Sequence, residues 1–85
     1  MKTPKIKTVN PMKNKQLLVK FENGVTRVYD CKPLLVKEMF RLLENEAFFK
    51  SVKVDSGGYG ISWNDDIDLS EYEIWVNGKE YPLAA

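Results

Sequence analysis

The sequence predicts an α+β domain in which an antiparallel five-stranded sheet packs on one main helix. Three patterns support this prediction: apolar residues alternate with polar ones before residue 31, recur at helical spacing between residues 34 and 49, and alternate again between residues 52 and 63. The expected order is three strands, the main helix, two strands and a short terminal helix. With 85 residues, 44% of them apolar, the chain should form a single domain over 1–85 with a structured core at about 5–78.

The first third of the chain is expected to form three strands. Ile6, Thr8 and Val9 suggest the first, which Asn10-Pro11 should end because proline supplies no N–H to the ladder. Residues 16–21 and 25–30 read as two longer strands. Between them stands Asn23-Gly24, the pair preferred in a two-residue type I′ turn.

A two-residue turn fixes the register of this hairpin, placing Phe21 opposite Thr26 and Val19 opposite Val28. One face, assigned to the core, then carries Leu17, Val19, Phe21 and Val28. The other face mixes apolar and charged side chains and is expected to meet water or a partner: Leu18, Lys20, Glu22, Val25, Arg27 and Tyr29.

The main helix is expected over residues 34–44, with Pro33 in its first turn, where the missing N–H costs little. Its sheet-facing side chains should be Leu35, Met39, Leu42 and either Leu43 or Phe40. Asn45 can cap a second short turn over residues 46–50. One of Phe48 and Phe49 should be buried there.

Two strands are expected after this helix, at residues 52–55 and 59–63, joined by a turn at Ser56-Gly57-Gly58. Tyr59, Ile61 and Trp63 alternate along the second strand and should share one face.

The end of the chain has two interpretations. Ser70 followed by Glu73 matches a capping box, which favours a short helix over residues 71–76 with Gly78 just past its end. Alternatively, Asn77-Gly78 could turn a hairpin between residues 74–76 and 79–81. The segment 70–83 is therefore expected to be a helix, with a hairpin as the alternative.

The residue types argue against an enzyme, a cofactor and a metal site. Cys31 is the sole cysteine and histidine is absent, so neither an intramolecular disulfide nor a zinc site of histidine and cysteine can form. Cys31 therefore has no customary base. The acidic residues at 65, 66 and 68 match the approach to a helix N-terminus better than a calcium loop. An unpaired cysteine and the lack of a signal or membrane-spanning stretch indicate a cytoplasmic protein.

Charge is distributed unevenly along the chain. Six lysines precede the first acidic residue, at positions 2, 5, 7, 13, 15 and 20, whereas acidic residues dominate beyond Ser51. This lysine-rich segment raises an alternative function, an accessory module that binds nucleic acid.

A family resemblance covers nearly the whole chain, from about Ile6 to Gly78. The residues that carry it are Leu17-Val19-Phe21, Asn23-Gly24, Tyr29-Asp30, Leu34-Leu35, Met39-Phe40, Leu43, Phe48-Phe49, Val52, Val54-Asp55, Ile61, Trp63, Asp68-Leu69, Trp75 and Gly78. The succession resembles the small bacterial family known as domain of unknown function 2442. The resemblance implies an α+β domain, often encoded beside a small protein of another uncharacterised family, 4160, in what looks like a toxin and antitoxin pair.

We therefore expect a non-catalytic cytoplasmic domain that binds a partner protein, a small toxin-like protein encoded nearby, with a homo-oligomer left open. The expected binding surface combines the outer side of the first hairpin with the segment from residue 63 to 75. Its candidate residues are Leu18, Val25, Tyr29, Trp63, Asp68 and Trp75.

Overall fold

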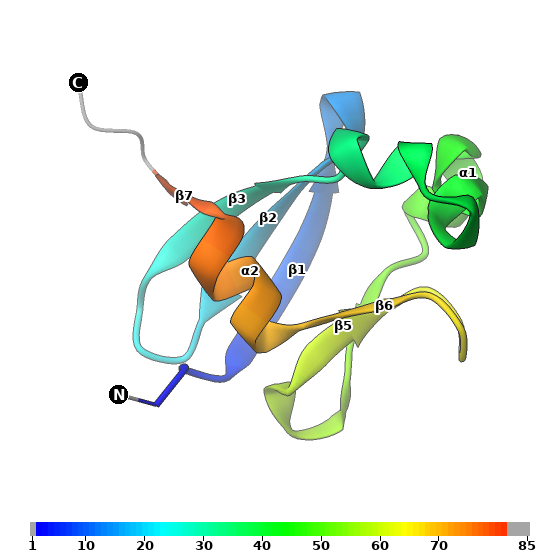
Figure 1. The fold of residues 1–85 in the computed structure, drawn as a ribbon. Helices are drawn as coiled ribbons and strands as arrows, with labels where there is room; N and C mark the ends of the chain where they lie inside the picture. Colours follow the sequence, from blue (N-terminus) through cyan, green and yellow to red (C-terminus); the bar gives the residue numbers. More distant parts are fainter. Residues whose placement is uncertain (1, 82–85) are drawn as a thin grey trace.

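Two antiparallel sheets organise the chain in the computed structural model, which describes residues 2–81 (Figure 1). The mixture of helices and antiparallel strands is confirmed, but the single five-stranded sheet is wrong. Sheet A has the strand order β1-β2-β3-β7, namely Ile6–Met12, Gln16–Phe21, Thr26–Asp30 and Lys79–Tyr81. Sheet B has the order β4-β5-β6, namely Lys53–Val54, Gly60–Ser62 and Asp68–Ser70.

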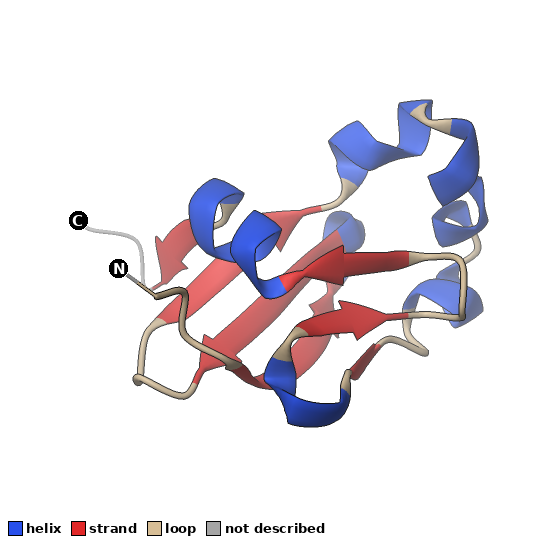
Figure 2. Cartoon of the chain, turned by 60° about the horizontal axis from the view of Figure 1, so that its bottom comes forward, coloured by secondary structure: helices blue, strands red, loops and turns tan. Residues whose placement is uncertain are grey.

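The helical segments are short. The 3₁₀ helices are η1 (Lys13–Lys15), η2 (Lys32–Val36), η3 (Glu38–Glu44) and η4 (Ser56–Gly58), and the α-helices are α1 (Glu46–Phe49) and α2 (Glu71–Asn77). Helix α2 and sheet B lie on the same side of sheet A, and the segments η2, η3 and α1 gather at one end (Figures 1 and 2).

Strand β1 continues through Pro11, contrary to the expected end at Asn10-Pro11. Pro11 lies opposite Leu17 in the ladder. Because β1 is paired only with β2 in sheet A, it is an edge strand, where a missing N–H is tolerated. The turn that follows holds Asn14 and Lys15 at positive φ, 62° and 57°.

The β2–β3 hairpin has a three-residue loop rather than the expected two-residue turn. The Gly24 N–H donates to the Phe21 carbonyl (3.0 Å), the Phe21 N–H donates to the Val25 carbonyl (2.8 Å), and Gly24 has a φ of 90°. This is a type I turn closed by a glycine bulge. The pairing shifts by one residue, so Leu17 lies opposite Tyr29 and the predicted faces of β3 are exchanged.

The predicted main helix is two 3₁₀ helices, since Lys37 between them is extended (φ −92°, ψ 130°). Phe40 and Leu43 are buried, but the predicted core residues Met39 and Leu42 are 59% and 55% exposed. A 3₁₀ helix repeats every three residues, so residues 40 and 43 share one side and residues 39 and 42 share another.

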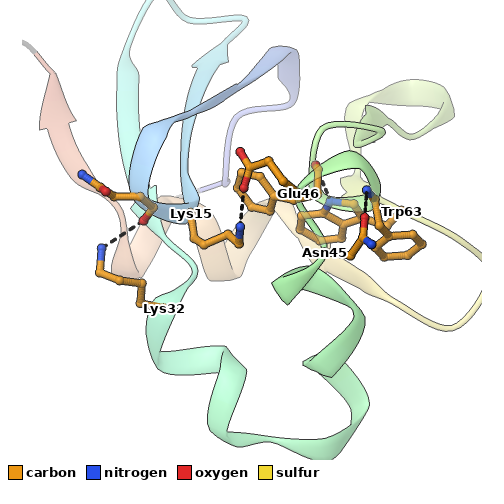
Figure 3. A network of polar contacts seen from close by, with 8 residues as sticks. Lys15, Lys32, Asn45, Glu46 and Trp63 are labelled. Carbon is orange, nitrogen blue, oxygen red and sulfur yellow. Dashed lines mark hydrogen bonds and ion pairs between the residues drawn. The ribbon is translucent and has the colours of Figure 1, made fainter.

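The predicted cap of α1 is confirmed and secures a cluster between the two sheets (Figure 3). The Asn45 side chain accepts a hydrogen bond from the Phe48 N–H (2.9 Å). Phe49, rather than Phe48, is fully buried, and its carbonyl accepts a hydrogen bond from the Trp63 indole N–H (2.9 Å). Lys15 of the β1–β2 turn is ion-paired with Glu46 of α1, so sheet A is tied to this cluster.

The terminal helix is confirmed, and the alternative hairpin between residues 74–76 and 79–81 is wrong. Strand β7 pairs with β3 instead. The Ser70 hydroxyl accepts from the Glu73 N–H (3.1 Å), as a capping box requires, but the Glu73 carboxylate turns to Tyr29. Residues 82 and 83 of the predicted segment lie outside the described residues.

One continuous core joins the two sheets. Its buried members come from both sheets and from the helical segments: Ile6, Leu17, Val19, Phe21, Tyr29, Cys31, Phe40, Leu43, Phe49, Ile61, Trp63, Ile67, Leu69 and Ile74. Within residues 2–81, no charged side chain is buried among them.

Candidate functional site

One face of sheet A carries no other element of the described chain. Helix α2 and sheet B cover the opposite face (Figures 1 and 2). The strand register assigns the following residues to this face, which we call the outer face: Thr8, Asn10, Met12, Gln16, Leu18, Lys20, Thr26, Val28, Asp30, Lys79 and Tyr81.

The centre of the outer face is apolar. Leu18 and Val28 lie opposite each other on adjacent strands, and both are half-buried, as is Met12. A hollow of about 280 Å³ extends from Met12 and Val28 to Lys79 and Tyr81. Tyr81 itself is 50% exposed. An apolar centre inside a polar border is the usual anatomy of a protein–protein interface.

The charges of the outer face are mostly positive. Lys20 and Lys79 are exposed on it. Its acidic residue, Asp30, is paired with Lys32 (3.1 Å), and hydrogen bonding and charge from Lys32 lower the pKa of the Asp30 carboxyl despite its desolvation. The surface therefore suits a partner that carries carboxylates.

A second recess lies on the opposite side of sheet A, between α2 and the start of η2. It has a volume of about 310 Å³, and its polar lining includes Tyr29 and Glu73. The Tyr29 hydroxyl donates to Glu73 Oε2 (2.9 Å). Burial, and then the Glu73 carboxylate, raise the pKa of Tyr29 well above its ordinary value.

The six residues predicted for a binding surface do not form one site. Leu18 lies on the outer face, and Val25 is half-buried beside the β2–β3 loop. Tyr29 and Trp63 belong to the core, with exposed fractions of 5% and 6%, so the predicted outward face of Tyr29 is wrong and neither ring offers much surface to a partner. Asp68 is exposed on β6, which belongs to sheet B and so is not part of the outer face of sheet A.

Trp75, the last of the six, is half-buried and held by packing. Its ring meets Phe21 edge to face, with centroids 5.1 Å apart, and the Arg27 guanidinium lies 4.1 Å from its centroid. These contacts explain the position of the indole without a partner. In the described chain, the buried Nε of Arg27 has no hydrogen-bond partner.

Of the four apolar or aromatic residues of the outer face, sequence reasoning found Leu18 and missed Met12, Val28 and Tyr81. Met12 was detectable, because Thr8, Asn10 and Met12 continue a two-residue alternation straight through Pro11. Val28 was missed because of the register error. Tyr81 was missed because only the tertiary fold brings residues 79–81 beside β3.

The sole thiol of the chain is shielded from solvent. Cys31 is fully buried, and burial raises the pKa of its thiol to about 12, so it is not a thiolate near neutral pH. Among the described residues, no three histidine, cysteine, aspartate or glutamate side chains are grouped to hold a metal ion. No helix in that part of the chain is both long and apolar enough to cross a bilayer.

Part of the lysine-rich segment is engaged within the fold. Lys15 pairs with Glu46, and its ammonium lies 5.4 Å from the centroid of the Phe49 ring. Lys32, at the same end of sheet A, donates to the Asn14 carbonyl (3.0 Å), as Figure 3 shows. Lys15 of the lysine-rich segment and the neighbouring Lys32 therefore both have partners within the fold.

Comparisons with known proteins identify the family but no characterised relative. Searches of curated proteins and of solved structures give no match. The model of one family, described as a protein of unknown function (DUF2442), matches residues 6–80. The match spans every strand of both sheets, apart from the last residue of β7. The chain therefore belongs to the DUF2442 family.

Proposed function

We propose that this chain is a non-catalytic, cytoplasmic protein-binding domain whose outer face docks a small partner protein. The observation that carries the proposal is the uncovered face of sheet A, with Leu18 and Val28 at its centre and Met12 at the end of its edge strand. Sheets of soluble proteins usually bury one apolar face and solvate a polar one. A second face with an apolar centre and a hollow is typical of an interaction surface.

The partner should present apolar side chains bordered by carboxylates. Lys20 and Lys79 would meet those carboxylates, and the hollow beside Tyr81 would receive an apolar side chain. Charge complementarity of this kind mainly sets the association rate and the choice of partner, whereas the apolar centre supplies most of the affinity.

The biological role we propose is that of an antitoxin, which neutralises a small toxin-like protein encoded nearby by covering its functional surface. The family resemblance supports this role, because members are often encoded beside a second small protein. The buried, protonated thiol of Cys31 supports a binding role rather than a catalytic one.

The proposal is tested by measuring association with the product of the adjacent gene by calorimetry. Leu18→Asp and Val28→Asp should each weaken binding by about tenfold or more, since they place a carboxylate in the apolar centre opposite an acidic partner. Leu42→Asp is the matched control, because Leu42 is 55% exposed on η3, away from the outer face.

Two results would contradict the proposal. One is that the two folded proteins fail to associate at micromolar concentration. The other is that Leu42→Asp weakens the complex as much as Leu18→Asp does, with circular dichroism showing both variants folded. Salt-sensitive binding to single-stranded DNA by the isolated chain, without any protein complex, would favour the alternative nucleic-acid module.

A further inference from the structure

The recess between α2 and η2 holds a carboxylate in a fixed position. Glu73 Oε2 accepts two hydrogen bonds, from the Tyr29 hydroxyl of β3 and from the Asn77 side-chain amide of α2, both at 2.9 Å. Donors from two different elements therefore restrain one carboxylate oxygen. The other oxygen, Oε1, accepts no hydrogen bond from the described residues, and it is not sealed from solvent.

The rest of the recess has an apolar wall. Pro33 and Leu34 line it from the η2 side, whereas Asp30 only borders it, with its carboxylate paired with Lys32 (3.1 Å). The recess of about 310 Å³ has room for an extended chain of a few methylene groups. Such a shape suits a ligand with an aliphatic stem and a polar head.

We propose that this recess binds a cationic head group, an ammonium or guanidinium, carried on an aliphatic stem. The head would donate to Glu73 Oε1, and the stem would lie along Pro33 and Leu34. A charge-assisted hydrogen bond to a carboxylate that is already held in place costs little reorganisation. This inference does not rest on the outer face, which lies on the other side of sheet A.

Glu73 supplies the negative charge that favours a cation at the inner end of the recess. Burial, and then the Glu73 carboxylate, raise the pKa of Tyr29, which keeps its hydroxyl protonated and donating to Glu73. Lys37 also lines the recess, but it makes no ion pair within residues 2–81 and is exposed. Its ammonium would repel an incoming cation, so removing it should strengthen binding.

The test uses N-acetyl-lysine N-methylamide and the corresponding arginine derivative as probes, with the glutamine derivative as the uncharged control. Binding to the full chain at pH 7 and low salt is followed by amide chemical shifts in two-dimensional NMR. The charged probes should shift the signals of Lys37, Glu73 and Asn77, and the glutamine derivative should not. Butylammonium, tested in parallel, shows whether a free alkylamine binds as well as a side chain presented by a peptide.

Two variants change the affinity in opposite directions. Glu73→Gln keeps the size of the side chain and an acceptor for Tyr29, and should weaken binding about tenfold or more because the charge is lost. Lys37→Ala should strengthen it roughly two- to fivefold at low salt, because a like charge is removed. Lys50→Ala, at an exposed lysine beyond α1, is the control and should change nothing.

The inference is overturned if the charged probes shift no signals around the recess at tens of millimolar. It is also overturned if Glu73→Gln binds as well as the natural chain, or if Lys37→Ala fails to tighten binding. Should Glu73→Gln not fold, the Lys37→Ala result decides alone. Because no partner protein is present in this experiment, its failure leaves the proposal for the outer face untouched.

Discussion

At the scale of single residues, Cys31 and Tyr29 show how burial controls chemistry in this domain. Both lie in the core where β3 leads into η2. Desolvation is the largest cause of the raised pKa of each group. A sulfur that is deeply buried and protonated behaves as a small apolar side chain rather than as a nucleophile.

Alkylation should reveal this protection. At pH 8, a thiol with a pKa of about 12 has roughly a thousandfold less thiolate than one with the ordinary value of 9.0. Iodoacetamide should therefore modify Cys31 about a thousandfold more slowly in the native chain than in urea, as measured by mass spectrometry. Equal rates in the two states would show that the thiol is accessible.

The same two groups should make the fold sensitive to alkali. Their pKa values are higher in the folded chain than in the unfolded chain, so above about pH 9 the unfolded state releases protons first and gains stability. The free energy of unfolding should be constant near neutral pH and fall above pH 9, by up to about 1.4 kcal/mol per pH unit for each group. Urea titrations at several pH values test this. Tyr29→Phe and Cys31→Ala should each reduce the slope.

The paired phenylalanines offer a matched test of burial. Phe49 is fully buried and its ring stacks near Trp63, with centroids 6.2 Å apart, whereas Phe48 is half-buried. Phe49→Ala should lower the free energy of unfolding by about 3–5 kcal/mol. Phe48→Ala should cost no more than about 2 kcal/mol. Urea denaturation distinguishes the two, and equal losses would contradict the assignment of Phe49 to the core.

At the scale of elements, η3 shows how a 3₁₀ repeat sorts side chains into columns. Phe40 and Leu43 face the core, whereas Met39 and Leu42 face solvent. The third column, residues 38, 41 and 44, is charged. The Arg41 guanidinium lies 3.4 Å from the Glu44 carboxylate and 3.9 Å from the Glu38 carboxylate. An α-helical period would have placed these residues differently, which is why the predicted inner face of this segment was only half correct.

Two glycines in turns, Gly24 between β2 and β3 and Gly58 in η4, should differ in how well they tolerate a side chain. Gly58 and Gly24 both have positive φ, 76° and 90°. A Cβ on Gly58 would lie 2.6 Å from the Ile6 carbonyl oxygen, whereas a Cβ on Gly24 would meet nothing within 4 Å. Gly24→Ala should lower the free energy of unfolding by about 1–2 kcal/mol, because alanine disfavours the left-handed backbone conformation. Gly58→Ala should cost clearly more, since η4 packs directly on β1.

Thermal unfolding of both variants tests this difference. A Gly58→Ala variant as stable as Gly24→Ala would show that η4 does not press against β1. Gly57 is unsuitable as the control, because a Cβ there would meet the Tyr59 ring at 2.8 Å.

Local sequence signals predicted elements well where the determinants were close in sequence. The caps at Asn45 and Ser70 and the strand over residues 16–21 are examples. The β2–β3 register failed because Asn23-Gly24 serves a two-residue turn and a three-residue loop with a glycine bulge almost equally well. That single-residue difference moved Tyr29 from the predicted surface into the core.

At the scale of the whole molecule, two small sheets depend on one core. Sheet B has only three short strands, and its buried residues Ile61 and Leu69 belong to the same cluster as Leu17 and Val19 of sheet A. Neither sheet has a separate interior. The chain should therefore unfold as one unit.

Tryptophan fluorescence tests this cooperativity. The chain has two tryptophans, Trp63 packed on Phe49 and Trp75 packed on Phe21. In the single-tryptophan variants Trp75→Phe and Trp63→Phe, the fluorescence midpoint in urea should coincide with the midpoint from far-ultraviolet circular dichroism of the same variant. Separate midpoints within either variant would show that the sheet B region and the α2 region unfold independently.

The candidate surfaces were the least predictable part from sequence, because they are assembled over long distances. Leu18 was identified correctly as facing away from the core, but its neighbours depended on the register and on β7. Strand β7 pairs with a segment about fifty residues earlier, and residues 79–81 carry no signal for that choice. The Glu73 recess likewise required α2 to lie beside β3.

The pairing of β7 with β3 also bears on how the protein is made. Residues 26–28 are synthesised about fifty residues before residues 79–81, so one edge of the first three strands stays open in the meantime. Nascent chains in that condition are vulnerable to pairing with one another. The last rows of the sheet can close only after residues 79–81 have been synthesised, so this edge of sheet A is completed late in folding.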